Sequence, residues 1–150
     1  MARISAKDRE QIAKMGARLQ RDVVVDLFTQ RESPLIVPGV VPCETCTVVE
    51  EVLAELQPLI PHVKVQTHDL VGERELAATR GIDRVPTLAF DGDLAGRIRF
   101  VGAPLGYEFA SFLSSIFEVG GTTKAASDTG LTRLAGVAQP VNLKVFVTPT

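Results

Sequence analysis

The chain has 150 residues, of which 45 % are hydrophobic and 23 % charged, and its formal net charge at pH 7 is −2. This length and composition suffice for one folded domain, or for one domain with an appendage, and exclude a chain that is disordered throughout. Because the net charge is slightly negative and the basic residues are dispersed, the composition argues against nucleic acid and anionic membranes as partners. Residues 1–10 lack the apolar segment of a signal peptide, and no apolar run approaches the ~20 residues that span a bilayer. We therefore expect a cytoplasmic protein.

The first two predicted elements are a helix and a buried strand. Ser5 can cap a helix whose apolar stripe consists of Ile12, Met15 and Leu19. Residues 22–29 then have an unbroken apolar centre, which is typical of a strand that is covered on both faces. We expect this strand in the middle of a sheet.

Both cysteines of the chain, Cys43 and Cys46, stand in front of an amphipathic run. The preceding residues 31–41, rich in Pro and Gly, are either a loop or a short extended piece. The run at 48–56 has apolar residues at helical spacing, which predicts a helix that begins at the cysteine pair. The N-terminus of a helix stabilises a thiolate and so lowers a thiol pKa. Cys43 is therefore the candidate nucleophile, and Cys46, expected one turn into the helix, is the candidate resolving thiol.

Two other interpretations of the cysteine pair remain open. Both thiols could be buried and inert. Alternatively, Cys43 and Cys46 with His62 and His68 fit a loose zinc-ligand spacing. The apolar segments throughout the chain favour the redox interpretation, because domains that need zinc to fold are short and poor in core.

The middle of the chain predicts a strand, a short helix and a hairpin. The predicted elements are a strand at 63–68, a helix at 73–80 ended by Gly81, a strand opened by Pro86, a turn at 91–93 and a return strand at 98–101. The last part predicts an amphipathic helix at 106–119, a linker at 120–128, a helix at 131–138 and an alternating strand at 141–147. The aromatic stripe of the first of these helices is typical of a core face.

The order of these elements resembles the thioredoxin-like arrangement. Residues 23–28 resemble the strand that precedes the thioredoxin active site, and 81–87 resemble the segment that faces the cysteines. The resemblance implies an α/β fold with a central mixed sheet flanked by helices, and a cis peptide at Pro86 across from Cys43. It also implies that the backbone of Val85 pairs with an extended substrate chain.

More closely, the chain resembles the glutaredoxin-like protein disulfide oxidoreductases, in which two thioredoxin-like units are fused. The N-terminal helix and the segments 102–109 and 143–150 carry this resemblance. It implies that residues 1–119 are a redox unit with an extra N-terminal helix. Residues 120–150 would then be a linker, a short helix and the first strand of an incomplete second unit. Because the family places a second cysteine pair directly after that strand, we expect either a truncated piece or a natural one-site variant.

The function that we expect is thiol-disulfide exchange on protein disulfides, with no cofactor in the chain itself. The resemblance implies that a flavoprotein similar to thioredoxin reductase supplies electrons. The alternatives are a glutathione-coupled glutaredoxin, the electron-delivery arm of a peroxide-reducing system, a zinc-binding module and a redox-inactive interaction domain.

Two further features lead to expectations. The strand at 141–147 has an apolar face and no evident partner, so we expect a homodimer or strand exchange through this tail. Asp26 stands 17 positions before Cys43, farther than the corresponding carboxylate of thioredoxins. It is either a proton shuttle or a solvated carboxylate at a strand end.

Overall fold

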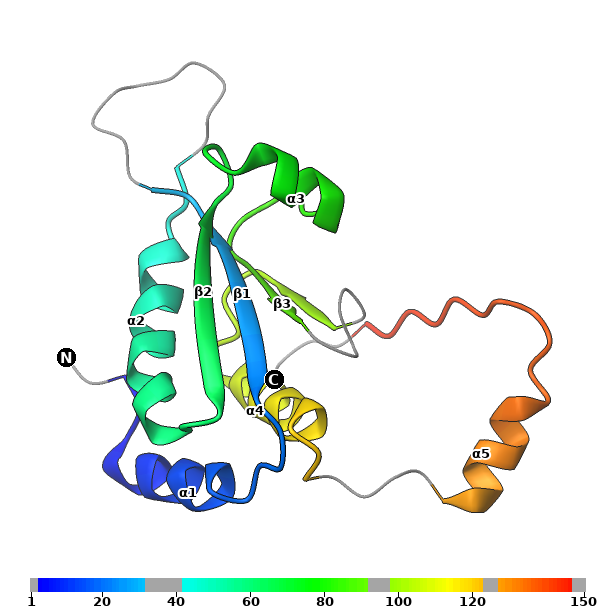
Figure 1. The fold of residues 1–150 in the computed structure, drawn as a ribbon. Coiled ribbons are helices and arrows are strands. Elements are labelled where there is room, and N and C mark those ends of the chain that lie inside the picture. The colour runs from blue at the N-terminus through cyan, green and yellow to red at the C-terminus, as the bar shows by residue number, and fades with distance from the viewer. Residues whose placement is uncertain (1–2, 32–41, 92–97, 123–126, 147–150) are drawn as a thin grey trace.

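The computed structural model describes residues 3–31, 42–91, 98–122 and 127–146. The helices are α1 (Ala6–Gly16), α2 (Cys46–Leu56), the single 3-10 turn η1 (Gln57–Leu59), α3 (Arg74–Arg80), α4 (Tyr107–Val119) and α5 (Asp128–Ala135). The strands are β1 (Val23–Thr29), β2 (Val63–Asp69), β3 (Thr87–Phe90) and β4 (Arg99–Val101). The expected α/β fold with a central mixed sheet is confirmed (Figure 1). No helix within the described ranges is both long and apolar enough to cross a bilayer.

The four strands form one sheet in the order β2-β1-β3-β4. β1 lies in the interior, as its unbroken apolar centre predicted. It pairs in parallel with β2 and antiparallel with β3, with Phe28 opposite Thr87. β3 and β4 form the predicted hairpin, with Thr87 opposite Val101. Gly92 and Asp93 of the predicted turn lie outside the described residues, as do 32–41 of the segment whose structure the sequence left open.

The two faces of the sheet carry separate apolar clusters. Alternate residues of β1, such as Val25 and Leu27, pack with α1, α2 and α4 in the main core. Phe28 points to the other face, where it packs with Ala77 of α3 and with Ile82. α1, α2 and α4 therefore cover one face, and α3 covers part of the other (Figure 1).

The N-terminal helix follows the sequence prediction with one difference. The hydroxyl of Ser5 accepts a hydrogen bond from the amide of Asp8 at 3.2 Å and so caps α1. Ile12 and Leu19 are buried, whereas Met15, which we placed in the same stripe, is 40 % exposed.

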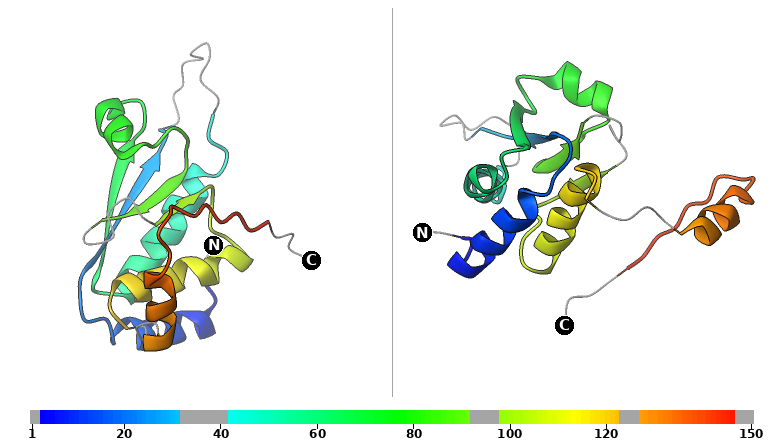
Figure 2. Two further views of the ribbon diagram at one scale, coloured as in Figure 1. Left: turned by 90° about the vertical axis from the view of Figure 1, so that its right-hand side faces the viewer. Right: turned by 60° about the horizontal axis from the view of Figure 1, so that its bottom comes forward.

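The C-terminal part differs more from the prediction. α5 begins at Asp128, three residues earlier than the expected helix, because Ser127 caps it by accepting a hydrogen bond from the amide of Gly130. Residues 141–146 form no strand, so that prediction is wrong for the described part of the segment. A strand needs a partner for its backbone groups, and the described residues provide none. Phe146 is 90 % exposed, and α5 and the segment after it lie apart from the sheet (Figure 2).

Candidate functional site

Cys43 and Cys46 are joined by a disulfide bond, with their Cα atoms 5.5 Å apart. Cys43 precedes α2 and is partly exposed, whereas Cys46 is the first residue of α2 and is 2 % exposed. The helix thus begins three residues later than predicted, and Cys46 does not lie one turn inside it. The amides of the first turn of α2 have no partner within the helix, so the pair still lies at its positive dipole end.

A cis peptide bond joins Val85 to Pro86, as the resemblance implies. Pro86 directly precedes β3, whose first residue, Thr87, pairs with Phe28 near the end of β1. At the same end, the hydroxyl of Thr29 donates a hydrogen bond to Glu50 of α2 at 2.8 Å. The structure therefore brings the cysteine end of α2 and the cis peptide to the same end of the sheet.

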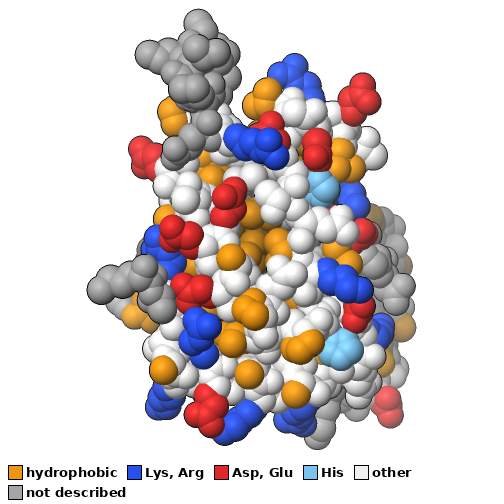
Figure 3. Space-filling model, turned by 60° about the vertical axis from the view of Figure 1, so that its left-hand side comes forward, with side chains coloured by type: hydrophobic (Ala, Val, Ile, Leu, Met, Phe, Trp, Pro, Cys, Tyr) orange, Lys and Arg blue, Asp and Glu red, His pale blue; other side chains and the backbone are white. Residues whose placement is uncertain are grey.

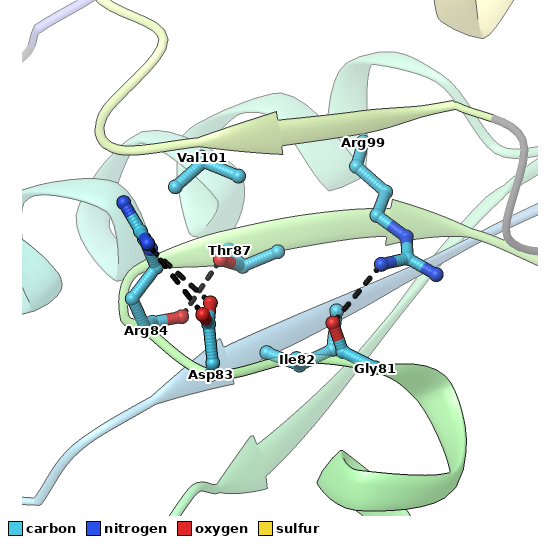
Figure 4. A pocket seen from close by; sticks show the side chains of 7 residues that line it. All are labelled: Gly81, Ile82, Asp83, Arg84, Thr87, Arg99 and Val101. Carbon is cyan, nitrogen blue, oxygen red and sulfur yellow. Dashed lines mark hydrogen bonds and ion pairs between the residues drawn. The ribbon is translucent and has the colours of Figure 1, made fainter.

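The loop that leads to Pro86 is held by side chains and by its own backbone. Gly81 ends α3 with a left-handed backbone (φ 64°), and the amide of Ile82 bonds to the carbonyl of Ala77 at 2.8 Å. Arg99 of β4 donates to the carbonyl of Gly81 at 3.1 Å. The Thr87 hydroxyl donates to the carbonyl of Arg84 at 2.7 Å. These contacts fix the backbone on both sides of Val85 (Figure 4).

The four residues of the zinc hypothesis are engaged elsewhere. The sulfurs of the two cysteines are bonded to each other, and His62 lies 2.8 Å from the carboxylate of Asp22. His68 stacks on Phe28, with ring centroids 5.0 Å apart. Figure 3 shows the two histidines as separate groups on the surface. The described parts of the chain contain no cluster of three or more potential metal ligands.

Asp26 belongs to a charged cluster that the sequence did not indicate. The residue is 2 % exposed, which contradicts the interpretation as a solvated carboxylate. Its carboxylate lies 3.3 Å from Nε2 of His68 and 3.4 Å from a guanidinium nitrogen of Arg80. Arg80 also contacts Asp91 at 3.4 Å. A carboxylate inside an apolar strand is a sequence signal for such a cluster. The sequence could not identify the partners of Asp26, because His68 and Arg80 are distant from it in the chain.

The side chain of Asp26 points away from the disulfide. Side chains of successive strand residues point to opposite faces of a sheet, and Thr29 on β1 points toward α2. Asp26, three positions earlier, points to the face that carries α3. This placement gives no support to a proton shuttle to the cysteines.

No protein-family model matches the sequence, and no curated protein matches it. Among solved structures, a protein disulfide oxidoreductase from Aeropyrum pernix K1 matches with a TM-score of 0.72 and 19 % identity, over 91 % of this chain and 56 % of that one. A point mutant of the alkylhydroperoxide reductase subunit AhpF of Enterococcus faecalis V583 matches with a TM-score of 0.74 and 19 % identity, over 91 % and 61 %.

A point mutant of a thioredoxin from Halobacterium salinarum NRC-1 matches with a TM-score of 0.51 and 19 % identity, over 83 % of this chain and 90 % of that one. The chain spans only 56 % and 61 % of the first two structures, so its likeness covers part of each. At these identities the likeness establishes the fold. The chain therefore has the thioredoxin-like fold of protein disulfide oxidoreductases and AhpF, with a Cys-x-x-Cys disulfide at the start of α2.

Proposed function

We propose that the chain is a thiol-disulfide oxidoreductase that acts on protein disulfides through Cys43 and Cys46. The observation that carries this proposal is the disulfide between a partly exposed Cys43 and a buried Cys46 at the start of α2. The cis Val85–Pro86 peptide at the same end of the sheet supports it. The first matching structure, a protein disulfide oxidoreductase, agrees with this activity.

The unequal exposure of Cys43 and Cys46 supports different roles for the two residues. In the reduced chain, the Cys43 thiolate attacks a substrate disulfide, forms a mixed disulfide and releases one substrate thiol. The Cys46 thiolate then attacks the Cys43 sulfur and releases the second substrate thiol. The substrate gains two electrons and two protons, and the chain returns to the disulfide form. Cys46 is buried beside Cys43, where it reaches the mixed disulfide but not a bulky substrate.

Val85 and Pro86 are proposed to bind the substrate backbone. Within the described residues, neither the N–H nor the C=O of Val85 has a hydrogen-bond partner, whereas the carbonyl of Pro86 accepts from the amide of Gly102 at 2.8 Å. Free backbone groups on a rigid loop can pair with an extended chain in the manner of an added strand. The substrate cysteine would then lie over Cys43.

Reduction of insulin tests the proposal. We expect Cys43→Ser to abolish the activity and Cys46→Ser to trap mixed disulfides that reducing agents release. Thr47→Ala changes an exposed residue in the same turn and serves as the control, which should keep the wild-type rate. Full activity of Cys43→Ser would refute the assignment.

The electron donor and the pathway are a separate proposal. The likeness to the alkylhydroperoxide reductase subunit AhpF favours a role in a peroxide-reducing system. Electrons would come from a flavoprotein similar to thioredoxin reductase, as the family resemblance implies. A glutathione-coupled reaction is the alternative. Equilibration with glutathione measures the reduction potential of the Cys43/Cys46 couple and so separates the two alternatives. A difference of 30 mV in that potential corresponds to about 1.4 kcal/mol for a two-electron couple.

We also propose that residues 1–119 form the redox unit and that 120–150 are a linker followed by the beginning of a second unit. The redox part contains the sheet and both apolar clusters, whereas no residue of α5 is buried. The exposed apolar residues of the C-terminal segment are Leu131, Leu134, Val137, Val141, Leu143, Val145 and Phe146. These side chains suit packing against further protein surface, either another unit or a second copy.

A further inference from the structure

A pocket of about 280 Å³ lies beside the cis peptide, between the loop after α3 and strand β4. We call it the loop pocket; its lining residues are Gly81, Ile82, Asp83, Arg84, Thr87, Arg99 and Val101 (Figure 4). Arg84 and Thr87 flank Val85 and Pro86 in the sequence. The pocket therefore adjoins the backbone that is proposed to pair with the substrate.

The loop pocket carries an excess of positive charge. Two of its lining residues are arginines and only Asp83 is acidic, which leaves a formal charge of about +1. Asp83 pairs with Arg84 at 3.1 Å and offsets that cation. Arg99 has a neutral partner, the carbonyl of Gly81, and no carboxylate partner among the described residues. Its charge is thus available to a ligand.

The shape and the chemistry of the lining suit a short acidic side chain. Figure 4 shows the guanidinium groups of Arg84 and Arg99 at opposite ends, with Thr87 and Val101 between them. Apolar carbons of Ile82 and Val101 can contact the methylene groups of a ligand. A guanidinium presents several N–H donors in one plane and can bind a carboxylate through two of them.

We propose that the loop pocket is a specificity subsite for an acidic residue next to the reactive cysteine of the substrate protein. The inference rests on the proposed function, because a substrate chain paired with Val85 brings its neighbouring side chains over the pocket. Arg99 is the main determinant and Arg84 the second. The subsite selects among protein disulfides and takes no part in the sulfur chemistry.

Single-turnover reduction of three peptide disulfides tests the subsite. The peptides differ only at the residue next to cysteine, which is Glu, Gln or Lys, and the reduced full chain is the reductant. We expect rate constants in the order Glu, Gln, Lys, with about two- to fivefold between steps, the range of an exposed ion pair. The differences should shrink at about 1 M salt, where the screening length is about 3 Å.

Four variants test whether the preference comes from the pocket. Arg84→Gln and Arg99→Gln should each bring the Glu-to-Gln ratio of rate constants closer to one. Arg74→Gln removes the same charge from exposed α3 outside the pocket and should leave the ratio unchanged. Since Arg99→Gln also removes a contact to the loop, Arg99→Lys, which keeps the charge, should retain part of the preference.

The outcomes separate the two proposals. Equal rates for the three peptides, or a Glu preference that survives both Arg84→Gln and Arg99→Gln, would overturn the subsite and leave the oxidoreductase proposal intact. Failure of the wild-type chain to reduce any of the peptides would overturn both.

Discussion

The buried contact between Asp26 and Arg80 predicts a large loss of stability when the carboxylate is removed. At 3.4 Å the attraction of the two charges is about 5 kcal/mol at an effective dielectric constant of about 20, before the cost of desolvation. Truncating one partner of a fully buried pair costs about 3 to 5 kcal/mol, mostly because the other charge is stranded. Arg80 keeps Asp91 and is 28 % exposed. We therefore expect Asp26→Ala to lower the free energy of unfolding by about 2 to 3 kcal/mol.

Urea unfolding at pH 7 measures this loss, provided that the slope of the unfolding free energy against urea concentration is the same in the wild type and the variant. Glu10→Gln is the control, because it breaks an exposed pair with Lys14 and should cost only about 0.3 to 0.5 kcal/mol. The double variant Asp26→Leu/Arg80→Leu should lose less than the sum of its single variants, since it removes both charges of the pair together and the other partner of Arg80, Asp91, is 40 % exposed. Asp26→Ala within about 0.5 kcal/mol of the wild type would refute the reasoning.

Two further predictions concern acid stability and the C-terminal segment. The pKa values of Asp22, Glu55 and Asp83 are lowered from 3.8, 4.5 and 3.8, chiefly by hydrogen bonds from Lys64, the Arg3 amide and Arg84. A lowered carboxyl pKa stabilises the fold above the unfolded value and loses that contribution as the pH falls through the folded value. The free energy of unfolding of the wild type should therefore decline as the pH falls below about 4.5, and that of the Glu55→Gln variant should decline less. For the segment, scattering at high concentration should reveal a dimer. Val145→Asp should weaken it, because the change puts a charge at an exposed apolar position, whereas Asn142→Asp, at an exposed polar position, should not. A strictly monomeric wild type would count against the dimer.

The fold could be predicted where the spacing of apolar residues agrees with the residues that end helices and strands. The α4 helix was predicted from apolar residues at helical spacing, and α3 from a run ended by Gly81, whose left-handed backbone the structure shows. These signals are local and do not depend on distant parts of the chain. The position of β1 in the sheet was predicted because its apolar centre requires cover on both faces.

The wrong predictions needed information that is not local. Residues 141–146 alternate as a strand does, but a strand forms only where another strand satisfies its backbone, and the described residues offer none. The start of α2 at Cys46 depends on how the chain enters the helix through the cysteine pair. The burial of Asp26 depends on His68 and Arg80, which only the fold brings near.

Topology explains why the placement of the candidate site could be predicted although the charged cluster could not. β1 and β2 are parallel, so the connection between them must return along the sheet, and α2 does this. α2 therefore begins at the end where β1 finishes. β3 runs antiparallel to β1 and so begins at that same end, where Pro86 precedes it. In any chain with this strand order, the residues before α2 and the residues before β3 lie at the same end of the sheet. A cysteine pair and a proline at those two positions are therefore brought to one end of the sheet. What distinguishes one such chain from another is the lining beside that end of the sheet, here Arg84 and Arg99, and for this reason we assign the proposed substrate preference to this lining.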